Sequence, residues 1–272
     1  MGTGVRAGSF SLEVLMANNI LFLGTGANDW LIEKRKKGMF FRRYTAALIN
    51  GEVLIDCGPH IFDFVEHYGD PHLLDNVKTV VITHRHSDHF CPETLMKIAG
   101  DHDVTLVCDD FCFSQITDTK GIKRIPMPLY KKTAIGDYKF IALPANHDVR
   151  GAGKDARHFI ITMPDDKELY YGLDGTWFST SEWLVLKKHQ CAVMVLDCTI
   201  GRVKDARVFE HNNMSMVRMM VKQIRKSKVL APGGVIVGSH FSRKLMPSHF
   251  NTRLMLKCYG IKAAEDGMKI EF

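Results

Sequence analysis

The stretch that decides the fold is Thr83-His84-Arg85-His86-Ser87-Asp88-His89, which directly follows the apolar run Val80-Val81-Ile82. Three histidines and one aspartate fall within six residues of this stretch. Imidazole and carboxylate groups are common ligands of zinc, manganese and iron, so the pattern His-x-His-x-Asp-His predicts a metal site in a loop at the end of a strand. The competing interpretation is a polar surface turn that is rich in histidine. Spacing alone gives Arg85 and Ser87 no role.

Three further strand-like runs lead to a residue of a metal-ligand type. The run at 140–143 leads to His147, the run at 169–173 to Asp174, and the run at 235–237 to His240. A rigid scaffold commonly places its chemistry in loops at strand ends. Donors for two metal ions are therefore available, and two ions about 3.5–4 Å apart can act together on one substrate.

The remaining sequence alternates between strand-like and helix-like patterns. Apolar runs bounded by turn residues predict strands at 20–23, 45–50, 52–56, 77–83, 104–108, 122–125, 138–143, 158–163, 168–173, 192–196 and 235–237. Asn50-Gly51 between two of these runs is a strong hairpin signal. Helical spacing predicts helices at 61–68, 92–99, 111–117, 181–189, 213–226 and 248–258. In the helix at 213–226, the stripe of Met216, Met219, Met220 and Ile224 is predicted to face the core.

This order of elements predicts an α/β protein of one domain. The 272 residues are 46% hydrophobic and 24% charged, which is ordinary for a globular chain. Two loosely similar halves suggest two sheets packed face to face with helices outside, and no linker or short repeat interrupts them. Residues 1–15 look unlike the rest and are interpreted as a tag or a misassigned start, so the domain is expected to span 16–272. No apolar run approaches the roughly 18 residues that span a bilayer, so no membrane partner is expected.

The cysteines and the net charge indicate the expected cellular compartment and the expected charge of binding partners. The seven cysteines are irregularly spaced, which favours free thiols in a reducing cytoplasm over a disulfide framework. The net charge of +6 mildly favours anionic partners. The basic run Lys34-Arg35-Lys36-Lys37, followed by Arg42-Arg43, is either a solvated loop or an electrostatic guide for substrates that carry phosphate.

The His-x-His-x-Asp-His pattern with separate His, Asp and His residues resembles the metallo-β-lactamase superfamily. The motifs Leu23-Gly24-Thr25-Gly26 and Leu54-Ile55-Asp56-Cys57-Gly58 extend this resemblance over nearly the whole chain. It implies a four-layer αββα sandwich with a dinuclear site, where zinc is the first expectation and manganese or iron the alternatives. The implied ligands are His84, His86 and His147 for one ion, Asp88, His89 and His240 for the other, and Asp174 as a bridge. Asp56 is expected either to hydrogen-bond within the site or to form a turn.

Two segments resemble the phosphodiesterase branch of that superfamily, which includes tRNase Z and the PhnP-like cyclic phosphodiesterases. Asp197 with Thr199 ends one strand, and His211 opens a helix soon after. The resemblance implies that His211 protonates the leaving oxygen, that Asp197 orients it, and that Asp88 also belongs to the catalytic set. In tRNase Z the acidic residue is typically Glu, so Asp197 departs from that pattern. The plainer interpretation of His211 is a solvent-exposed residue at a helix start.

The resulting expectation is a dinuclear, metal-dependent phosphoric diester hydrolase that acts on a small phosphodiester, such as a cyclic one, through a metal-bridging hydroxide. The alternatives are a tRNase Z-like RNA-processing endonuclease and a lactonase-type hydrolase. A nucleic-acid partner is not favoured, because no long Gly/Pro-rich arm interrupts the motifs. The cysteine-rich zinc site frequent in PhnP-like proteins is also missing. A homodimer is expected by resemblance only. The remaining histidines are expected to be exposed or half-buried: His60, His67, His72, His102, His158, His189 and His249.

Overall fold

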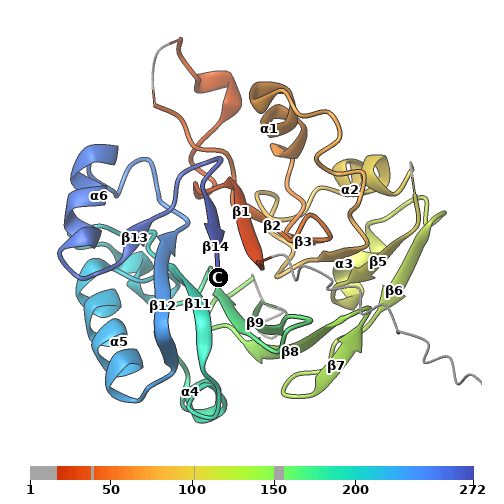
Figure 1. Cartoon of the computed structure of the whole chain (residues 1–272). Helices are drawn as coiled ribbons and strands as arrows, with labels where there is room; N and C mark the ends of the chain where they lie inside the picture. Colours follow the sequence, from red (N-terminus) through yellow and green to blue (C-terminus); the bar gives the residue numbers. More distant parts are fainter. Residues whose placement is uncertain (1–16, 38–39, 101, 150–155) are drawn as a thin grey trace, which may run out of the picture.

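Two seven-stranded sheets form the centre of the computed structural model, which describes residues 17–37, 40–100, 102–149 and 156–272 (Figure 1). In spatial order the first sheet contains β14 (Lys269–Glu271), β1 (Asn19–Gly24), β2 (Ala46–Ile49), β3 (Val53–Ile55), β4 (Thr79–Val81), β5 (Val104–Val107) and β6 (Ile122–Ile125). The second contains β13 (Lys262–Ala263), β12 (Leu230–Ser239), β11 (Cys191–Asp197), β10 (Glu168–Gly172), β9 (Arg157–Thr162), β8 (Tyr138–Pro144) and β7 (Lys132–Ile135). The predicted extension 1–15 lies outside the described residues.

Helices cover the outer face of each sheet, so the predicted αββα sandwich is confirmed (Figure 1). The first sheet carries α1 (Ile61–Tyr68), α2 (Pro92–Ala99) and α3 (Asp110–Ser114). The second carries α4 (Thr180–Leu186), α5 (Met214–Lys226) and α6 (His249–Lys257). Two short 3-10 helices, η1 (Ile32–Lys34) and η2 (Ala206–Phe209), lie in the loops after β1 and β11. Within the described ranges, no helix has the length and apolar character needed to cross a membrane.

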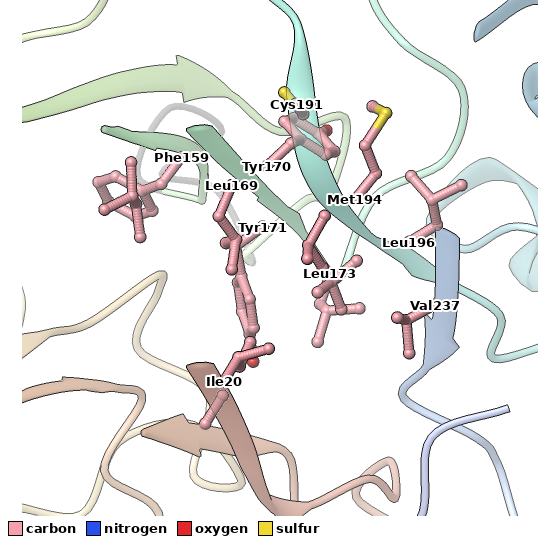
Figure 2. Close-up of a cluster of buried hydrophobic side chains, with 14 of the residues drawn as sticks. Ile20, Phe159, Leu169, Tyr170, Tyr171, Leu173, Cys191, Met194, Leu196 and Val237 are labelled. Atoms are coloured by element: carbon pink, nitrogen blue, oxygen red, sulfur yellow. The ribbon is translucent and has the colours of Figure 1, made fainter. Parts of the chain in front are cut away.

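The alternation of side chains along β10 explains how the second sheet packs against the first sheet on one face and against helices on the other. Figure 2 shows Tyr171 pointing from β10 towards Ile20 of the facing sheet, whereas Tyr170 lies on the other side of the strand, beside Cys191. All three side chains of Ile20, Tyr170 and Tyr171 are fully buried. Successive strand residues point to opposite faces. Both faces of the second sheet are therefore packed, one against the first sheet and the other against helices.

The direction of the strands brings the predicted site residues to one edge of the sandwich. β3 to β6 run parallel in the first sheet, and β10 to β13 run parallel in the second. The loops that follow β4, β8, β10, β11 and β12 carry the histidine motif and the other candidate ligands. Because the carboxyl ends of parallel strands meet at the same edge, residues far apart in sequence converge there.

The predicted motif Leu23-Gly24-Thr25-Gly26 has a steric cause. A Cβ atom on Gly24 would overlap the backbone carbonyl oxygen of Tyr44. Backbone hydrogen bonds join Thr25 and Ala27 to Phe241, the residue after the predicted ligand His240. Glycine therefore lets the end of β1 pack closely between two other segments, and this packing supports one wall of the site.

We expect Gly24→Ala to lower the free energy of unfolding by about 3 kcal/mol, because the added methyl group meets backbone that cannot move aside. Gly136→Ala is the matched control, since its Cβ would point into open space at φ 56° and should cost only about 1 kcal/mol. Urea unfolding of both variants at equal metal content measures the difference. Equal losses would contradict the steric explanation.

The structure corrects several burial predictions. Met219 is 54% exposed, although Met216, Met220 and Ile224 on the same helix are buried as predicted. Arg42 and Arg43 are only 2% and 3% exposed, so the end of the basic run is not a solvated loop. Arg43 instead forms ion pairs with Asp63 and Asp266, and the guanidinium of Arg42 donates hydrogen bonds to Thr25 and to the carbonyl of Ala264.

Two histidines that were expected at or near the surface are buried. His60 stacks on Tyr44 and accepts a hydrogen bond from the Tyr44 amide. His158 is 2% exposed and pairs with the fully buried Glu182. The short strands β7, β13 and β14 were not predicted, and β12 begins at Leu230 rather than at residue 235. All seven cysteines are free and five of them are buried, which agrees with the prediction of free thiols.

Candidate metal centre and active site

Asp174 lies at the centre of the converging loops. Its Oδ2 atom is 2.9 Å from Nε2 of His89 and 3.1 Å from Nε2 of His84. Its Oδ1 atom is 2.9 Å from Nδ1 of His240. Oδ2 thus lies between two imidazoles of the histidine motif, and Oδ1 faces a histidine from a different loop.

The seven predicted ligands fall into two groups that share Asp174. The potential ligand atoms within each group all lie within 4.8 Å of one another. The first group is His84, His86, His147 and Asp174, and the second is Asp88, His89, Asp174 and His240. The structure therefore brings together all seven residues, which we call the His/Asp cluster, in the distribution that the family resemblance implied.

Hydrogen bonds from the first sheet orient His84 and His89. Nδ1 of His89 donates to Oδ2 of Asp56 at 2.7 Å. The hydroxyl of Thr83 donates to Oδ1 of Asp56, so it accepts from Nδ1 of His84 at 3.0 Å. Both rings therefore hold their proton on Nδ1 and present the Nε2 lone pair to the cluster. Such partners fix the tautomer of a metal-binding histidine.

His147 and His240 are oriented in the same way from the second sheet. Nδ1 of His147 donates to the carbonyl oxygen of Glu210 at 3.3 Å. The hydroxyl of Thr199 donates to Oδ2 of Asp197 at 2.9 Å and so accepts from Nδ1 of His240 at 2.7 Å. Since these two Nδ1 atoms carry protons, the Nε2 lone pairs point inwards.

The inward-facing nitrogens approach one another closely. Nδ1 of His86 lies 2.9 Å from Nε2 of His84 and 3.2 Å from Nε2 of His147. Nε2 of His89 lies 3.4 Å from Nε2 of His240. Two ligands about 2.0–2.1 Å from a tetrahedral ion are separated by roughly 3.3 Å. A proton on Nδ1 of His86 could be shared with only one of the two facing nitrogens, so at least one close pair of lone pairs remains, which a metal ion would relieve. The donor set therefore fits metal ions.

An unsatisfied carboxylate oxygen supports the same fit. Oδ1 of Asp174 is buried and has no hydrogen bond among the described residues, because the nearby Nδ1–H of His240 is directed at Thr199. A buried charged oxygen without a partner is costly. A metal ion would satisfy it.

Electrostatics in the His/Asp cluster favour positive charge. Burial lowers the pKa of His147 to about 4, which keeps this imidazole neutral with a free lone pair. Burial would raise the pKa of Asp174, but the attraction of His240 and His89 outweighs it and holds that pKa well below the ordinary value. Burial would likewise lower the pKa of His240, yet Asp174 raises it to about 10. Asp174 thus favours a positive charge beside it, which is either a protonated imidazole or a bound cation.

Asp56 hydrogen-bonds within the site, which was the first of the two roles predicted for it. It is fully buried, and its Oδ1 also accepts from the amide of Thr83 at 2.8 Å. A Cβ atom on Gly58 would overlap the carbonyl oxygen of Asp88, so glycine allows the two loops to touch. The motif around Asp56 is therefore explained by the support it gives to the histidine loop.

Asp56→Asn should weaken metal binding by roughly 10- to 100-fold, because an amide cannot accept from Thr83 and His89 on both of its atoms. Competition with a chromophoric chelator measures the dissociation constant. Asp118→Asn, a change at an exposed carboxylate, is the control and should leave it unaltered. Unchanged affinity in Asp56→Asn would show that His89 does not depend on this hydrogen bond.

His211 lies beside the cluster and is held by Asp197. Its Nδ1 donates to Oδ2 of Asp197 at 3.0 Å, and its side chain is only 12% exposed. Burial would lower the pKa of His211, but Asp197 outweighs it through charge and hydrogen bonding and raises that pKa. Asp197 also accepts from the amides of Thr199 and Asn212, which fix the carboxylate itself. His211 is thus nearly buried beside the cluster and fixed by Asp197, and it is not a solvent-exposed residue at a helix start.

The cluster opens into a small pocket of about 150 Å³. Asn28, Asp29, Arg207 and Glu210 line its mouth, together with members of the cluster and His211. Arg85, inside the histidine motif, lies outside this lining, donates to the carbonyl of Val149 at 2.6 Å and lies over the ring of Phe111. These contacts connect the histidine loop to the loop after β8 and to α3.

Two supporting features were missed from the sequence. Nδ2 of Asn212 donates to the carbonyl of Gly175, next to Asp174, and its Oδ1 accepts from the amide of Trp177. Nδ1 of His158 lies 2.7 Å from Glu182, and a Cβ on Gly175 would stand 2.6 Å from Nε2 of His158. No local signal reveals these contacts, because each depends on partners 17 or more residues away.

Comparison with models of known domain families assigns the chain to a family. The beta-lactamase superfamily domain matches residues 52–241, which include the histidine motif, Asp174 and His240. The chain belongs to the beta-lactamase superfamily. This assignment agrees with the αββα sandwich and with the position of the His/Asp cluster at its edge.

Solved structures of the superfamily share the fold at low sequence identity. The metallo-beta-lactamase fold protein YhfI from Bacillus subtilis is 16% identical with a TM-score of 0.72, covering 94% of this chain and 100% of that one. A diphosphatase from the PhnP family is 17% identical with a TM-score of 0.69, covering 94% and 98%. The short form of human tRNase Z is 16% identical with a TM-score of 0.63, covering 93% and 98%. No curated protein gives a match. These superfamily neighbours establish the fold alone.

Proposed function

We propose that this protein is a dinuclear metal-dependent hydrolase that cleaves a small phosphodiester. The single observation that carries the proposal is the His211–Asp197 pair beside the His/Asp cluster, because an alkoxide leaving from phosphorus needs a positioned proton donor. Two divalent ions, zinc by first expectation, would polarise the phosphoryl group and lower the pKa of the attacking water. Solved neighbours described as a PhnP-family diphosphatase and a tRNase Z support phosphoester chemistry.

The residues of the chain divide the remaining work. His84, His86 and His147 would hold one ion, while Asp88, His89 and His240 would hold the other. Asp88 also lines the pocket, where its carboxylate can accept a proton from the attacking water. His211 would give the proton on Nε2 to the leaving oxygen while Nδ1 stays bound to Asp197. The free thiols suit a reducing compartment such as the cytoplasm.

A screen of substrate classes on the purified, metal-loaded protein tests the proposal. Its members are bis(4-nitrophenyl) phosphate, cyclic nucleotides, cyclic ribose phosphates, lactones and a precursor tRNA. We expect hydrolysis of the small phosphodiesters, no hydrolysis of lactones, and close to two transition-metal ions per chain by elemental analysis. A folded, metal-free protein, or hydrolysis restricted to lactones, would refute the proposal.

A further inference from the structure

The positive charge of this protein is concentrated in about one fifth of the chain. Residues 201–259 contain 12 Lys and Arg residues but only two acidic ones, Asp205 and Glu210. The rest of the chain contains 24 Lys and Arg residues and 28 Asp and Glu residues. The segment therefore carries a net charge of +10 and the remainder carries −4, so the overall +6 conceals a strongly asymmetric distribution.

These cations are displayed on one flank of the molecule. The segment comprises the loop after β11, α5, β12 and α6, and Figure 1 shows α5 and α6 along the same side of the second sheet. Eleven of the twelve side chains are exposed, and Arg243 is half-buried. Among the described residues, only Arg207 and Arg253 of this set form ion pairs with carboxylates. Within the described ranges, the other ten form no ion pair with a carboxylate, although Arg225 donates to the carbonyl oxygens of Tyr259 and Gly260.

Two grooves cross this basic flank on either side of Arg202 and Val203. The first, about 760 Å³, is lined by Lys204 and Arg218 together with Met219 and Tyr259. The second, about 530 Å³, is lined by Lys244, Leu254 and other residues of α6 and the loop before it. The first groove combines three cations with apolar side chains, and the second is mainly apolar with Arg202 and Lys244 at its rim, a combination that suits a ligand with negative charges and flat apolar faces.

The basic flank is continuous with the active site. The loop after β11 lines the first groove with residues 201–205 and carries His211 at its other end. Between them, Arg207 lines the mouth of the catalytic pocket and is held by Asp205. A ligand lying along the groove would therefore pass the site at the position where a leaving group is protonated.

We propose that the basic flank binds a single-stranded nucleic acid and presents one of its phosphodiesters to the His/Asp cluster. This inference rests on the proposed phosphodiesterase chemistry and extends its substrate class, with the small diester as the minimal substrate. A nucleic-acid strand matches the repeated, unpaired cations. Phe209 and Phe250 are 80% and 73% exposed, and unpaired bases can stack on such rings. A second copy of the chain would bring like charges together on this flank.

Fluorescence anisotropy with labelled 12-nucleotide RNA and DNA, made with a phosphorothioate backbone to slow cleavage, tests the inference on the metal-loaded full chain. We expect binding that weakens with salt. The triple variant Arg202→Gln, Lys204→Gln, Arg218→Gln should lose at least tenfold in affinity and reduce the salt slope by about 2, at roughly 0.7 per phosphate contact. The matched control is Lys120→Gln, Lys131→Gln, Lys132→Gln. It removes three exposed cations beside β6 and at the start of β7, on the sheet edges away from the basic flank.

Binding measurements with other ligands show whether the partner is something other than a single-stranded nucleic acid. Equal loss in both triple variants, tighter binding of a duplex than of a single strand, or binding only to phosphatidylserine vesicles would overturn the inference. Preference for either RNA or DNA would support it, since both present the same backbone charge. Turnover of bis(4-nitrophenyl) phosphate by the unsubstituted protein reports on the catalytic proposal separately. Turnover without strand binding would refute only the basic-flank inference, and binding without any phosphodiester turnover would refute the catalytic proposal.

Discussion

Asp174→Asn is expected to remove both metal and activity. The substitution keeps the shape of the side chain but removes the charge that faces His84, His89 and His240 at 2.9–3.1 Å. An amide oxygen is neutral and binds a metal ion more weakly than a carboxylate oxygen, so the ligand that the two groups share is weakened. We expect fewer than one tightly bound ion per chain, and a loss in kcat/KM greater than the roughly 10- to 100-fold that follows removal of an orienting partner.

Elemental analysis after gel filtration and phosphodiester kinetics on the same sample measure both effects. Asp165→Asn removes an exposed carboxylate in the turn after β9 and should leave metal content and kcat/KM unchanged. If Asp174→Asn kept two ions per chain and full activity, Asp174 would not bridge them, and the assignment of the two groups would be wrong.

His211→Ala is expected to reduce activity according to the leaving group. For a phosphodiester with an alkyl leaving group, kcat/KM should fall by about 10²- to 10⁴-fold, because the departing alkoxide then has no proton donor. For a 4-nitrophenyl ester the loss should be much smaller, since 4-nitrophenolate leaves without a proton. The metal content should equal that of the unsubstituted protein, because His211 hydrogen-bonds to Asp197 and belongs to neither of the two predicted ligand groups.

His72→Ala, which removes an exposed imidazole paired with Asp75, is the control for this experiment. The decisive alternative is visible in the structure, where Asp174, Asp197, His211 and His240 form a third set with ligand atoms within 4.8 Å of one another. If His211→Ala lost metal in proportion to activity, with equal effects on both leaving groups, His211 would be a ligand in this third set and not a proton donor.

The candidate ligands could be predicted from the sequence where they directly follow a strand. The apolar run before His84 and the runs before His147, Asp174 and His240 are local patterns, so their strands and loops could be predicted without knowing the fold. The convergence of those loops followed from the family resemblance and not from spacing. The left-handed turn at Asn50-Gly51 was also predictable, since both residues have positive φ values of 51° and 73°.

The features that were not predicted depend on distant partners. The burial of Arg43 requires Asp266, which lies 223 residues later in the chain. The strand β14 exists because Lys269–Glu271 pairs with β1 at the start of the described chain. His158 is buried because Tyr170 and Glu182 reach it from another strand and a helix. The basic flank was hidden because the composition of the whole chain averages its charge with an acidic remainder.

Three residues of the site have a backbone conformation that side chains disfavour. Asp56, Asp174 and His240 have φ values of 61°, 52° and 61°. Each such residue costs on the order of 1–2 kcal/mol relative to the right-handed region, and glycine would avoid that cost. At position 56 glycine would leave the buried donors of Thr83 and His89 without an acceptor, so the strain there is offset by hydrogen bonds. Positions 174 and 240 are different, because there glycine would relieve the backbone strain and remove a predicted metal ligand at the same time. A protein selected only for thermal stability should therefore accept glycine at 174 or 240 and lose its catalytic activity.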